Sequence, residues 1–255
     1  NPLVSFPESG RIKAALAKLE LLIVQEIAAT ELTEMAHVVF PGAAAAEKNG
    51  SFTTPDNRVQ CLNRAVAPPG EAREDWDIIA ELFSRLTGEP HARSVADVTA
   101  ELREKSGLYS GSCSMVDGRC SGLAKQQWSA PVRYAFTPVA SPASVPAQEG
   151  QGSFVLAVGA IGFHNGTMST NSENNLTVSP EGYIEIAADD AGRLGITDGT
   201  PVKVSSAAGS ITGPAKVSKR LQAGLLFAPC HFRDLNVSSL LKRNTNLATV
   251  KVEKG

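Results

Sequence analysis

The sequence predicts an α/β segment with parallel strands followed by a small, mostly-β closed barrel. In the first hundred residues, helical and strand patterns alternate with short connections, as in a right-handed strand–helix–strand unit. From Ser153 onward, short strands recur between turn signals, which is typical of a small barrel. The stretch between them is rich in Gly, Ser, Pro and Ala and lacks periodicity. We therefore expect folded units at residues 1–105 and 153–255, joined by a linker at 106–152.

The α/β segment begins with a helix and two strands. Residues 8–18 carry apolar side chains at helical spacing, and the run LELLIVQ at 19–25 predicts a strand buried on both faces of a parallel sheet. Thr30 is expected to cap a short helix through Ala36. Residues 37–40 then form a second strand, which Pro41-Gly42 ends.

Two helices follow a polar stretch. Residues 47–64 are rich in polar and turn-forming residues. Residues 75–86 predict an amphipathic helix, and residues 95–105 predict a second helix. The apolar face expected to be core carries Trp76, Ile79, Ala80 and Phe83.

The barrel strands are expected at 154–158, 183–186, 201–205, 210–218, 225–228 and 249–253, with a short helix at 189–194. Asp198-Gly199 is a typical hairpin turn pair. Ala208-Gly209 marks the turn between the third and fourth strands.

Bulk properties limit the class of protein. The chain has 24 basic and 26 acidic residues, a balance that argues against a nucleic-acid binder. It has no apolar run long enough to cross a bilayer and no signal-peptide pattern. Because it begins at Asn1 rather than Met, we expect further residues upstream. The expected location is cytoplasmic, or peripheral to the inner membrane through partner subunits.

The four cysteines are Cys61, Cys113, Cys120 and Cys230. None forms a Cys-x-x-Cys pair, so this segment carries no zinc or iron–sulfur signature of its own. We expect free thiols in a reducing compartment, with a Cys113–Cys120 bridge as the alternative.

Two blocks together resemble the molybdopterin-dinucleotide oxidoreductases. The first is AHVVFP at 36–41 followed by EKNGSFTTPDNRVQ at 47–60, where the family typically has ADVVLP and EKDGTFTNTEGRVQ. The second runs through residues 183–204 and contains the pattern DAxxLGIxDG. His37 and Thr54 depart from the family's Asp and Asn, and Thr54 lacks an amide that could pair with a guanine or phosphate group.

The resemblance implies the C-terminal portion of an oxidoreductase large subunit, with a Rossmann-like part-domain and a double-psi-type barrel that binds molybdopterin guanine dinucleotide. Formate dehydrogenase and the large iron–sulfur subunit of respiratory complex I (NADH-quinone oxidoreductase) belong to this family. It also implies partner subunits and electron transfer through upstream iron–sulfur clusters. Within this segment it implies no metal ligand and no catalytic residue.

The loop after the first barrel strand, GAIGFHNGTMST at 159–170, offers the backbone N–H groups and hydroxyls that a pyrophosphate needs. The family's first barrel loop is similar, so the expected cofactor contacts here are Gly159, His164, Thr167, Met168 and Ser169. The alternative is an ordinary surface loop.

Three more residues are candidates for cofactor binding. The family places a His and an Asn near the pterin, where this chain has His231 and Asn236, and for His231 a purely structural role is equally open. Arg58, with Glu47 and Lys48, is expected to address a dinucleotide end; the alternative is that Glu47, Lys48 and Asp56 form a solvated turn.

Two functional cases remain within the family, and one outside it. The residues 68–76, PPGEAREDW, and the short tail after Leu241 favour the complex I subunit, in which the barrel binds or structurally replaces the pterin site. The second case is a true molybdenum or tungsten enzyme such as formate dehydrogenase. The third is a non-catalytic nucleotide-binding or assembly module, since a barrel of this kind does not by itself imply redox work.

Overall fold

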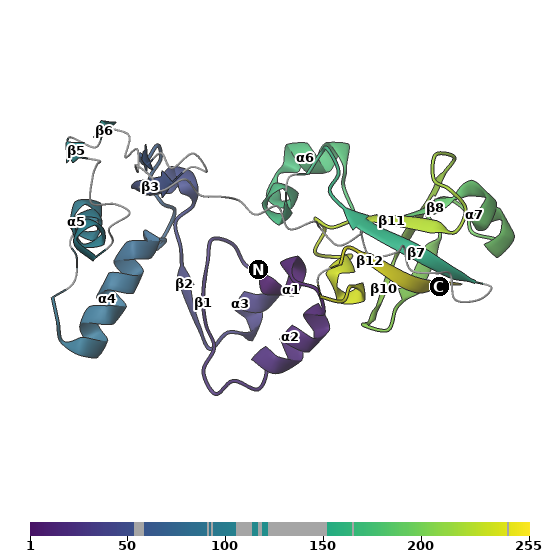
Figure 1. Cartoon of the computed structure of the whole chain (residues 1–255), viewed down its shortest axis with the longest axis horizontal. Helices are drawn as coiled ribbons and strands as arrows, with labels where there is room; N and C mark the ends of the chain where they lie inside the picture. Colours follow the sequence, from purple (N-terminus) through teal and green to yellow (C-terminus); the bar gives the residue numbers. More distant parts are fainter. Residues whose placement is uncertain are drawn as a thin grey trace, which may run out of the picture. The chain divides into compact units, whose positions relative to one another are not determined.

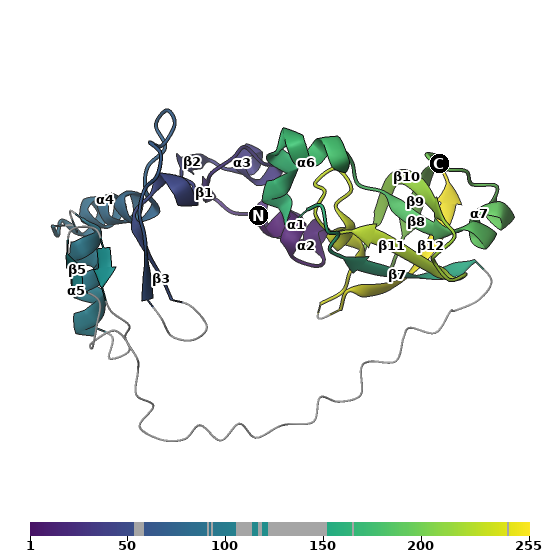
Figure 2. The same cartoon turned by 90° about the horizontal axis from the view of Figure 1, so that it is seen from above.

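The computed structural model describes residues 1–53, 59–90, 92, 94–105, 152–164, 166–243 and 245–255, together with the backbone of two short strands at 114–116 and 119–121. The chain forms two compact units (Figures 1 and 2). The first comprises residues 1–20 and 137–255, and the second comprises residues 21–136. Most of the expected linker at 106–152 lies outside the described residues.

The first unit is built on a closed barrel of six strands. These are β7 (Ser153–Gly159), β8 (Ile184–Ala187), β9 (Pro201–Ser205), β10 (Ser210–Ser218), β11 (Leu225–Pro229) and β12 (Leu247–Lys254). Their order around the barrel is β10-β8-β11-β7-β12-β9, and β9 pairs with β10 to close it. Two pairs are parallel, β7 with β11 and β8 with β10. The predicted fold class is confirmed.

The barrel core comes from the alternation of side chains along each strand. In β9, Val202 and Val204 are buried while Pro201 and Lys203 are exposed. Leu156 of β7 and Leu226 of β11 are fully buried in the same cluster. Apolar residues of the segment after β11 close one end of this core: Phe232, Leu235, Val237 and Leu240.

The first unit also contains short helices and 3-10 turns. They are α1 (Pro2–Ser5), α2 (Ser9–Leu16), α6 (Glu173–Val178) and α7 (Ala188–Leu194), with 3-10 turns η3 (Thr167–Asn171) and η4 (Val237–Leu240). The predicted helices at 8–18 and 189–194 are present as α2 and α7. Both α1 and α2 contact η4.

The two aspartates of the DAxxLGIxDG pattern hold backbone amides. Asp190 is 3% exposed and accepts the Gly224 N–H at 2.6 Å. Asp198 accepts the Val217 N–H at 2.8 Å, and the Gly199 N–H is donated to the Ala215 carbonyl. The hairpin expected at Asp198-Gly199 is therefore wrong. This turn leads from α7 into β9, and its polar groups bond to β10. A hairpin is not formed because β8, the strand before the turn, pairs in parallel with β10 and not with β9.

The second unit contains a two-stranded parallel sheet of β1 (Ile23–Glu26) and β2 (Val38–Pro41), linked through α3 (Glu31–Met35). Thr30 caps α3 as predicted, with its hydroxyl oxygen accepting the Thr33 N–H. The expected burial on both faces is wrong in this chain. Ile23 is 44% exposed and Val39 is 43% exposed, because the sheet has only two strands among the described residues.

The polar stretch at 47–64 contains more order than expected. After a 3-10 turn η1 (Ala45–Glu47), β3 (Gly50–Thr53) and β4 (Val59–Leu62) form an antiparallel pair. Lys48 pairs with Asp75, which also accepts a hydrogen bond from Gln25 at 2.5 Å. Burial alone would raise the pKa of Asp75, but the bonds from Lys48 and Gln25 outweigh it and lower the pKa.

Helices α4 (Asp75–Thr87) and α5 (Val95–Lys105) match their predicted spans, and two further short strands are β5 (Ser114–Val116) and β6 (Arg119–Ser121). The buried side of α4 is not the expected one. Ile78 is buried, whereas Ile79 is 59% exposed and Phe83 is 48% exposed. The helical period located the apolar stripe, and its Trp76 and Ala80 are half-buried, but Ile79 and Phe83 remain exposed.

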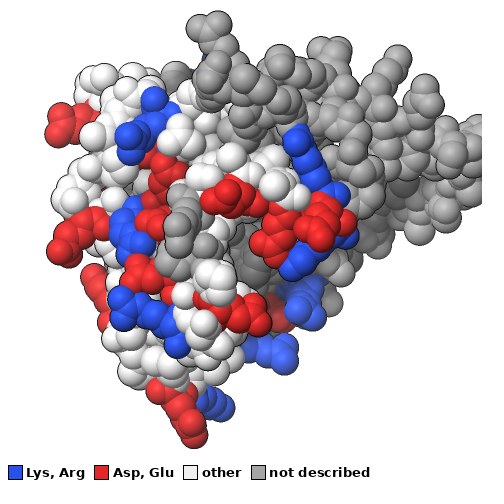
Figure 3. Space-filling model, turned by 90° about the vertical axis from the view of Figure 1, so that its left-hand side faces the viewer, with Lys and Arg blue, Asp and Glu red and all other residues white. Residues whose placement is uncertain are grey.

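Ion pairs run along the polar side of α4. Arg73 pairs with Asp77 and Glu81, and Glu81 also pairs with Arg85. Figure 3 shows acidic and basic side chains interleaved on the face that it views. Such mixing leaves no large field of one sign on that face, as far as its residues are described.

Two further findings concern the cysteines and membranes. Cys61 is in a disulfide bond, so the expectation of free thiols is wrong for this residue, while Cys230 is free. Cys113 and Cys120 carry no described side chain. In the described part of the chain, no helix combines the length and apolar character needed to span a bilayer.

Candidate functional site

A cavity of about 580 Å³ lies in the first unit, where β7 and β11 end. Its walls come from Val158, the loop residues 166–168, Cys230 and His231, the segment after η4 and the α1 region. β7 and β11 are parallel neighbours, with Gly159 opposite Pro229, so their carboxyl ends meet at the same edge. In parallel sheets, this edge is where ligands commonly bind. The volume falls in the range of small-molecule sites.

A hydrogen bond between Gly166 and His231 connects the loop after β7 to the segment after β11. The Gly166 N–H donates to Nδ1 of His231 at 3.0 Å. Gly166 has φ 98° and ψ 175°, a conformation that is essentially open only to glycine. Since Nδ1 accepts this bond, the neutral ring carries its proton on Nε2. That N–H has the Cys230 sulfur 4.0 Å away, a weak acceptor, so it is available to a ligand.

Gly166→Ala is expected to lower the free energy of unfolding of the barrel unit by about 1–3 kcal/mol, because a Cβ is strained in this conformation. Urea unfolding followed by circular dichroism measures the change. Gly162→Ala is the matched control, since it lies in the same loop, has no positive φ and has open space around its Cα. Equal stability of the two variants would contradict the conclusion that the backbone at position 166 requires glycine.

His231 is held in its neutral form. It is 6% exposed, and burial lowers its pKa, with a smaller contribution from His164. Cys230, beside it, is also kept neutral because burial raises the pKa of its thiol. The cavity wall therefore presents uncharged donors at neutral pH, which suits a polar heteroaromatic ring better than an anion.

This lowered pKa predicts a pH dependence of stability. Below the ordinary histidine pKa of about 6.5, the unfolded chain binds a proton that folded His231 rejects. The stability contribution is thus fully present above that pH and is lost as the pH falls toward the lowered pKa. In His231→Gln, the slope of unfolding free energy between pH 7 and 5.5 should be flatter, by at most about 1.4 kcal/mol per pH unit. If urea titrations gave the same pH slope of unfolding free energy for the unaltered chain and for His231→Gln, the lowered pKa of His231 would be contradicted.

His164 lies behind the cavity wall and organises the loop. It is 2% exposed, its Nε2 lies 2.9 Å from the Ser179 carbonyl oxygen, and its Nδ1 lies 3.0 Å from Ser169 Oγ. A carbonyl only accepts, so Nε2 carries a hydrogen. The ring also packs edge-to-face on Phe232 at 4.9 Å.

The structure brings most of the predicted site residues into one region. Thr167, Met168 and His231 line the cavity. His164 and Ser169 support its loop, and the Ser169 hydroxyl donates to the Gly166 carbonyl at 2.7 Å.

Two other predicted residues, Gly159 and Asn236, are not among the residues that line the cavity. The Gly159 carbonyl accepts the Cys230 N–H, and a Cβ at Gly159 would lie 3.2 Å from the Phe227 ring. Asn236 donates to the Leu3 carbonyl at 3.0 Å and accepts from Ser238, so it attaches α1 to η4. Arg58 lies outside the described residues.

Several lining residues were not predicted. Cys230 is adjacent to His231 in the sequence, and Ser238 follows Asn236 by two positions. Both could therefore have been predicted from their closeness to a candidate residue. Val4 and Pro7 had none, because they reach the cavity through contacts with residues more than two hundred positions away.

The lining residues fit one end of a molybdopterin-type cofactor. His231, which is nine-tenths buried, and Thr167 both line the cavity and bring an imidazole and a hydroxyl to it. Glycines at 162 and 166 leave open space beside the backbone of the loop. Heteroaromatic rings with a few convergent polar groups are the ligands that such a lining favours.

Comparison with known proteins identifies both halves of the chain. The family model for molybdopterin oxidoreductase matches residues 1–85. The model for the molydopterin dinucleotide binding domain matches residues 160–253. All the cavity-lining residues from Gly166 to Thr245 fall inside the second match.

Curated relatives agree with these matches. The chain is 49% identical over its whole length to NADPH-Fe(3+) oxidoreductase subunit alpha of Geobacter sulfurreducens, and it covers 29% of that protein. It is 36% identical, over 94% of its length, to F420-dependent formate dehydrogenase subunit alpha of Methanocaldococcus jannaschii, of which it covers 38%. It is 32% identical over its whole length to an NADH-quinone oxidoreductase subunit of Rhizobium meliloti, of which it covers 29%.

A solved structure shares the fold. Acetylene hydratase from Pelobacter acetylenicus superposes with a TM-score of 0.69 at 16% identity, covering 99% of this chain and 43% of that one. The two family models, the relatives and the closed barrel agree, and the chain belongs to the molybdopterin oxidoreductase family.

Proposed function

We propose that this chain is part of the large subunit of an NAD(P)H-linked, electron-transferring oxidoreductase, and that its cavity receives the pterin end of a molybdopterin dinucleotide. The observation that carries the proposal is the cavity itself, whose lining residues from Gly166 to Thr245 lie in the dinucleotide-binding match. The 49% identity to an NADPH-Fe(3+) oxidoreductase subunit supports the choice of electron donor.

In this proposal, the chain binds and orients its cofactor. His231 donates its Nε2–H to an acceptor on the pterin ring, while Gly166 fixes the ring orientation from the opposite nitrogen. The Thr167 hydroxyl supplies a second polar contact. The redox chemistry belongs to the cofactor, and the protein supplies its position and electrostatic surroundings. Iron–sulfur clusters and partner subunits are proposed for the parent protein.

Two versions of the parent protein follow from the relatives. The complex I version rests on 32% identity to an NADH-quinone oxidoreductase subunit, and in it the barrel is retained as a scaffold without pterin. The formate dehydrogenase version rests on 36% identity to a formate dehydrogenase subunit. The 49% match favours oxidation of a nicotinamide nucleotide over oxidation of formate.

Activity of the intact parent protein tests the electron donor. Purified protein is assayed with NADPH, NADH or formate as donor and ferric citrate or a quinone as acceptor. We expect reduction with a nicotinamide nucleotide, and activity with formate alone would overturn that part of the proposal. Elemental analysis and pterin extraction test the cofactor separately. Molybdenum or tungsten with pterin is the expected result, and absence of all three would favour the scaffold version.

Cys230 provides a direct test of cavity occupancy. Its thiol lines the cavity and is the free cysteine of the described residues. Alkylation by iodoacetamide, located by peptide mass spectrometry, is expected to be slower in the cofactor-loaded parent protein than after cofactor extraction. An unchanged rate at Cys230 would place the cofactor elsewhere, whatever the activity assay shows.

A further inference from the structure

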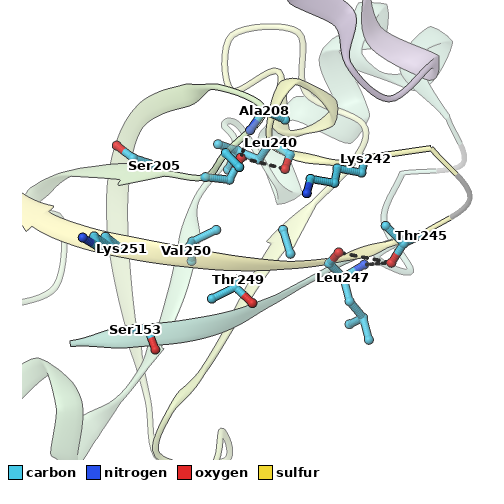
Figure 4. Close-up of a pocket in the computed structure, with 13 residues that line it drawn as sticks. Ser153, Ser205, Ala208, Leu240, Lys242, Thr245, Leu247, Thr249, Val250 and Lys251 are labelled. Carbon is cyan, nitrogen blue, oxygen red and sulfur yellow. Dashed lines mark hydrogen bonds between the residues drawn. The ribbon is translucent and has the colours of Figure 1, made fainter. Parts of the chain in front are cut away.

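A second cavity, of about 670 Å³, lies along the first half of β12 (Figure 4). Its lining comes from β12, the turn between β9 and β10, and the connection from η4 to β12. It shares Thr245 with the first cavity but none of the residues assigned to the cofactor.

This groove exists because β12 lacks a strand partner on one side over half its length. β12 pairs with β7 from Leu247 to Lys251, but with β9 only from Lys251 onward. Beyond Ser205, β9 turns away. Residues 247–250 therefore present one free edge, about 13 Å long at the usual rise per residue.

The hydrogen-bond alternation directs backbone groups into the groove. Val158 donates its N–H to the Asn246 carbonyl, and bonded pairs recur at every second residue of an antiparallel ladder. Ala248 and Val250 thus bond to β7, and Thr249 directs its N–H and C=O toward the groove. Leu247 is already satisfied, because Thr245 Oγ1 accepts its N–H and donates to its carbonyl.

The opposite wall is held in place. The Ser206 hydroxyl donates to the Leu240 carbonyl at 2.9 Å and accepts the Ala208 N–H at 3.0 Å. A Cβ at Gly209 would lie 2.9 Å from the Ser239 carbonyl oxygen, so only glycine lets the turn approach η4 this closely. The groove keeps its width because the β9–β10 turn is attached to η4.

The charges on the groove have one sign. Lys242 lies in the connection that leads into β12, and Lys251 lies where the free edge ends. Figure 4 shows them toward opposite ends of the groove. The lining includes no carboxylate, and neither lysine has an ion pair among those found in the described residues.

We propose that this groove binds an extended acidic segment of a partner chain, which adds a short strand to the free edge of β12. Strand addition uses backbone hydrogen bonds for affinity, here from Thr249. Carboxylates at the two ends of the segment pair with Lys242 and Lys251. Ala207, Ala208 and Leu247 are at least partly exposed and contribute apolar lining that accepts an alternating aliphatic side chain. A small phosphate would leave that apolar lining unused, so the peptide is the better fit. This site is independent of the cofactor proposal.

Binding of model peptides to the 255-residue chain tests the groove. The probe is the acetylated and amidated peptide EVEVE, compared with KVKVK, with EPEPE, which cannot donate at its proline positions, and with inorganic pyrophosphate. Binding is measured by NMR titration, with the Thr249 amide as reporter. The variant carries Lys242→Glu and Lys251→Glu. Lys219→Glu is the control, because Lys219 is exposed and lines neither cavity.

EVEVE is expected to shift the Thr249 amide and to bind the double variant at least about tenfold more weakly than the Lys219→Glu control. KVKVK should show the reverse preference, and EPEPE should bind weakly to all proteins. Equal binding of EVEVE to the variant and the control would overturn the proposal. Binding of EPEPE as tight as that of EVEVE, or displacement of EVEVE by low concentrations of pyrophosphate, would replace it with a simple anion site.

Discussion

His164→Ala is expected to lower the free energy of unfolding of the barrel unit by about 3 kcal/mol. The substitution leaves the Ser179 carbonyl without its donor, removes a ring packed on Phe232 and opens a void at a 2% exposed position. Hydrogen exchange of amides in β7 and β11 measures the loss without interference from the second unit.

Ser169→Ala is the graded companion to this variant. It removes the partner of His164 Nδ1 and the bond to the Gly166 carbonyl, but it leaves the Ser179 contact intact. A loss of about 1 kcal/mol is expected. If both variants were as stable as the parent, His164 would be a dispensable surface residue, contrary to its burial.

Asp190→Ala is expected to cost about as much, roughly 3 kcal/mol, for a different reason. Its carboxylate is 3% exposed and accepts the Gly224 N–H at 2.6 Å, which ties α7 to the turn before β11. Alanine leaves that buried amide unsatisfied and removes a charge-assisted bond. Thermal and urea unfolding both report the loss.

Arg193→Ala distinguishes the contribution of the hydrogen bond from the Gly224 N–H from that of the ion pair. Arg193 pairs with Asp190 at 2.6 Å, but its side chain is 64% exposed, so solvent weakens the pair. We expect a change below about 1 kcal/mol. A loss in Arg193→Ala equal to that in Asp190→Ala would show that the ion pair, rather than the Gly224 amide, is the important partner.

The sequence predicted the barrel well because its strands alternate and end at marked turns. β9 and β10 match their expected spans, and α7 matches the helix expected at 189–194. The Asp198-Gly199 pair misled because a turn sequence identifies a bend and not the strands that flank it. Pairing β8 with β10 depends on contacts that no local pattern contains.

The second unit was harder because its apolar faces stay partly exposed among the described residues. The pattern of α4 predicts one buried stripe, yet Ile79 and Phe83 remain exposed. Periodicity shows which residues share a face, but it cannot show whether anything covers that face.

The candidate site was predicted in part. The Gly-rich loop and His231 could be predicted because they resemble positions that the family places near its cofactor, whereas composition alone favoured an ordinary surface loop. The supporting roles of His164 and Asn236 could not, since the loop composition is the same whether a histidine faces a ligand or a carbonyl. Only the bonds to Ser179 and Leu3 distinguish these cases.

The attachment of residues 1–9 to η4 has a kinetic consequence. Asn236 contacts Leu3 across 233 residues of chain, and Glu8 donates its N–H to the Leu241 carbonyl. Closing so long a loop costs about 5 kcal/mol in chain entropy. During synthesis, residues 1–9 are made more than two hundred residues before η4, so their binding partner does not yet exist when they emerge. The cavity wall that residues 1–9 supply therefore forms only after η4 has been made, and a truncation just after β11 would remove that partner together with β12, which closes the barrel.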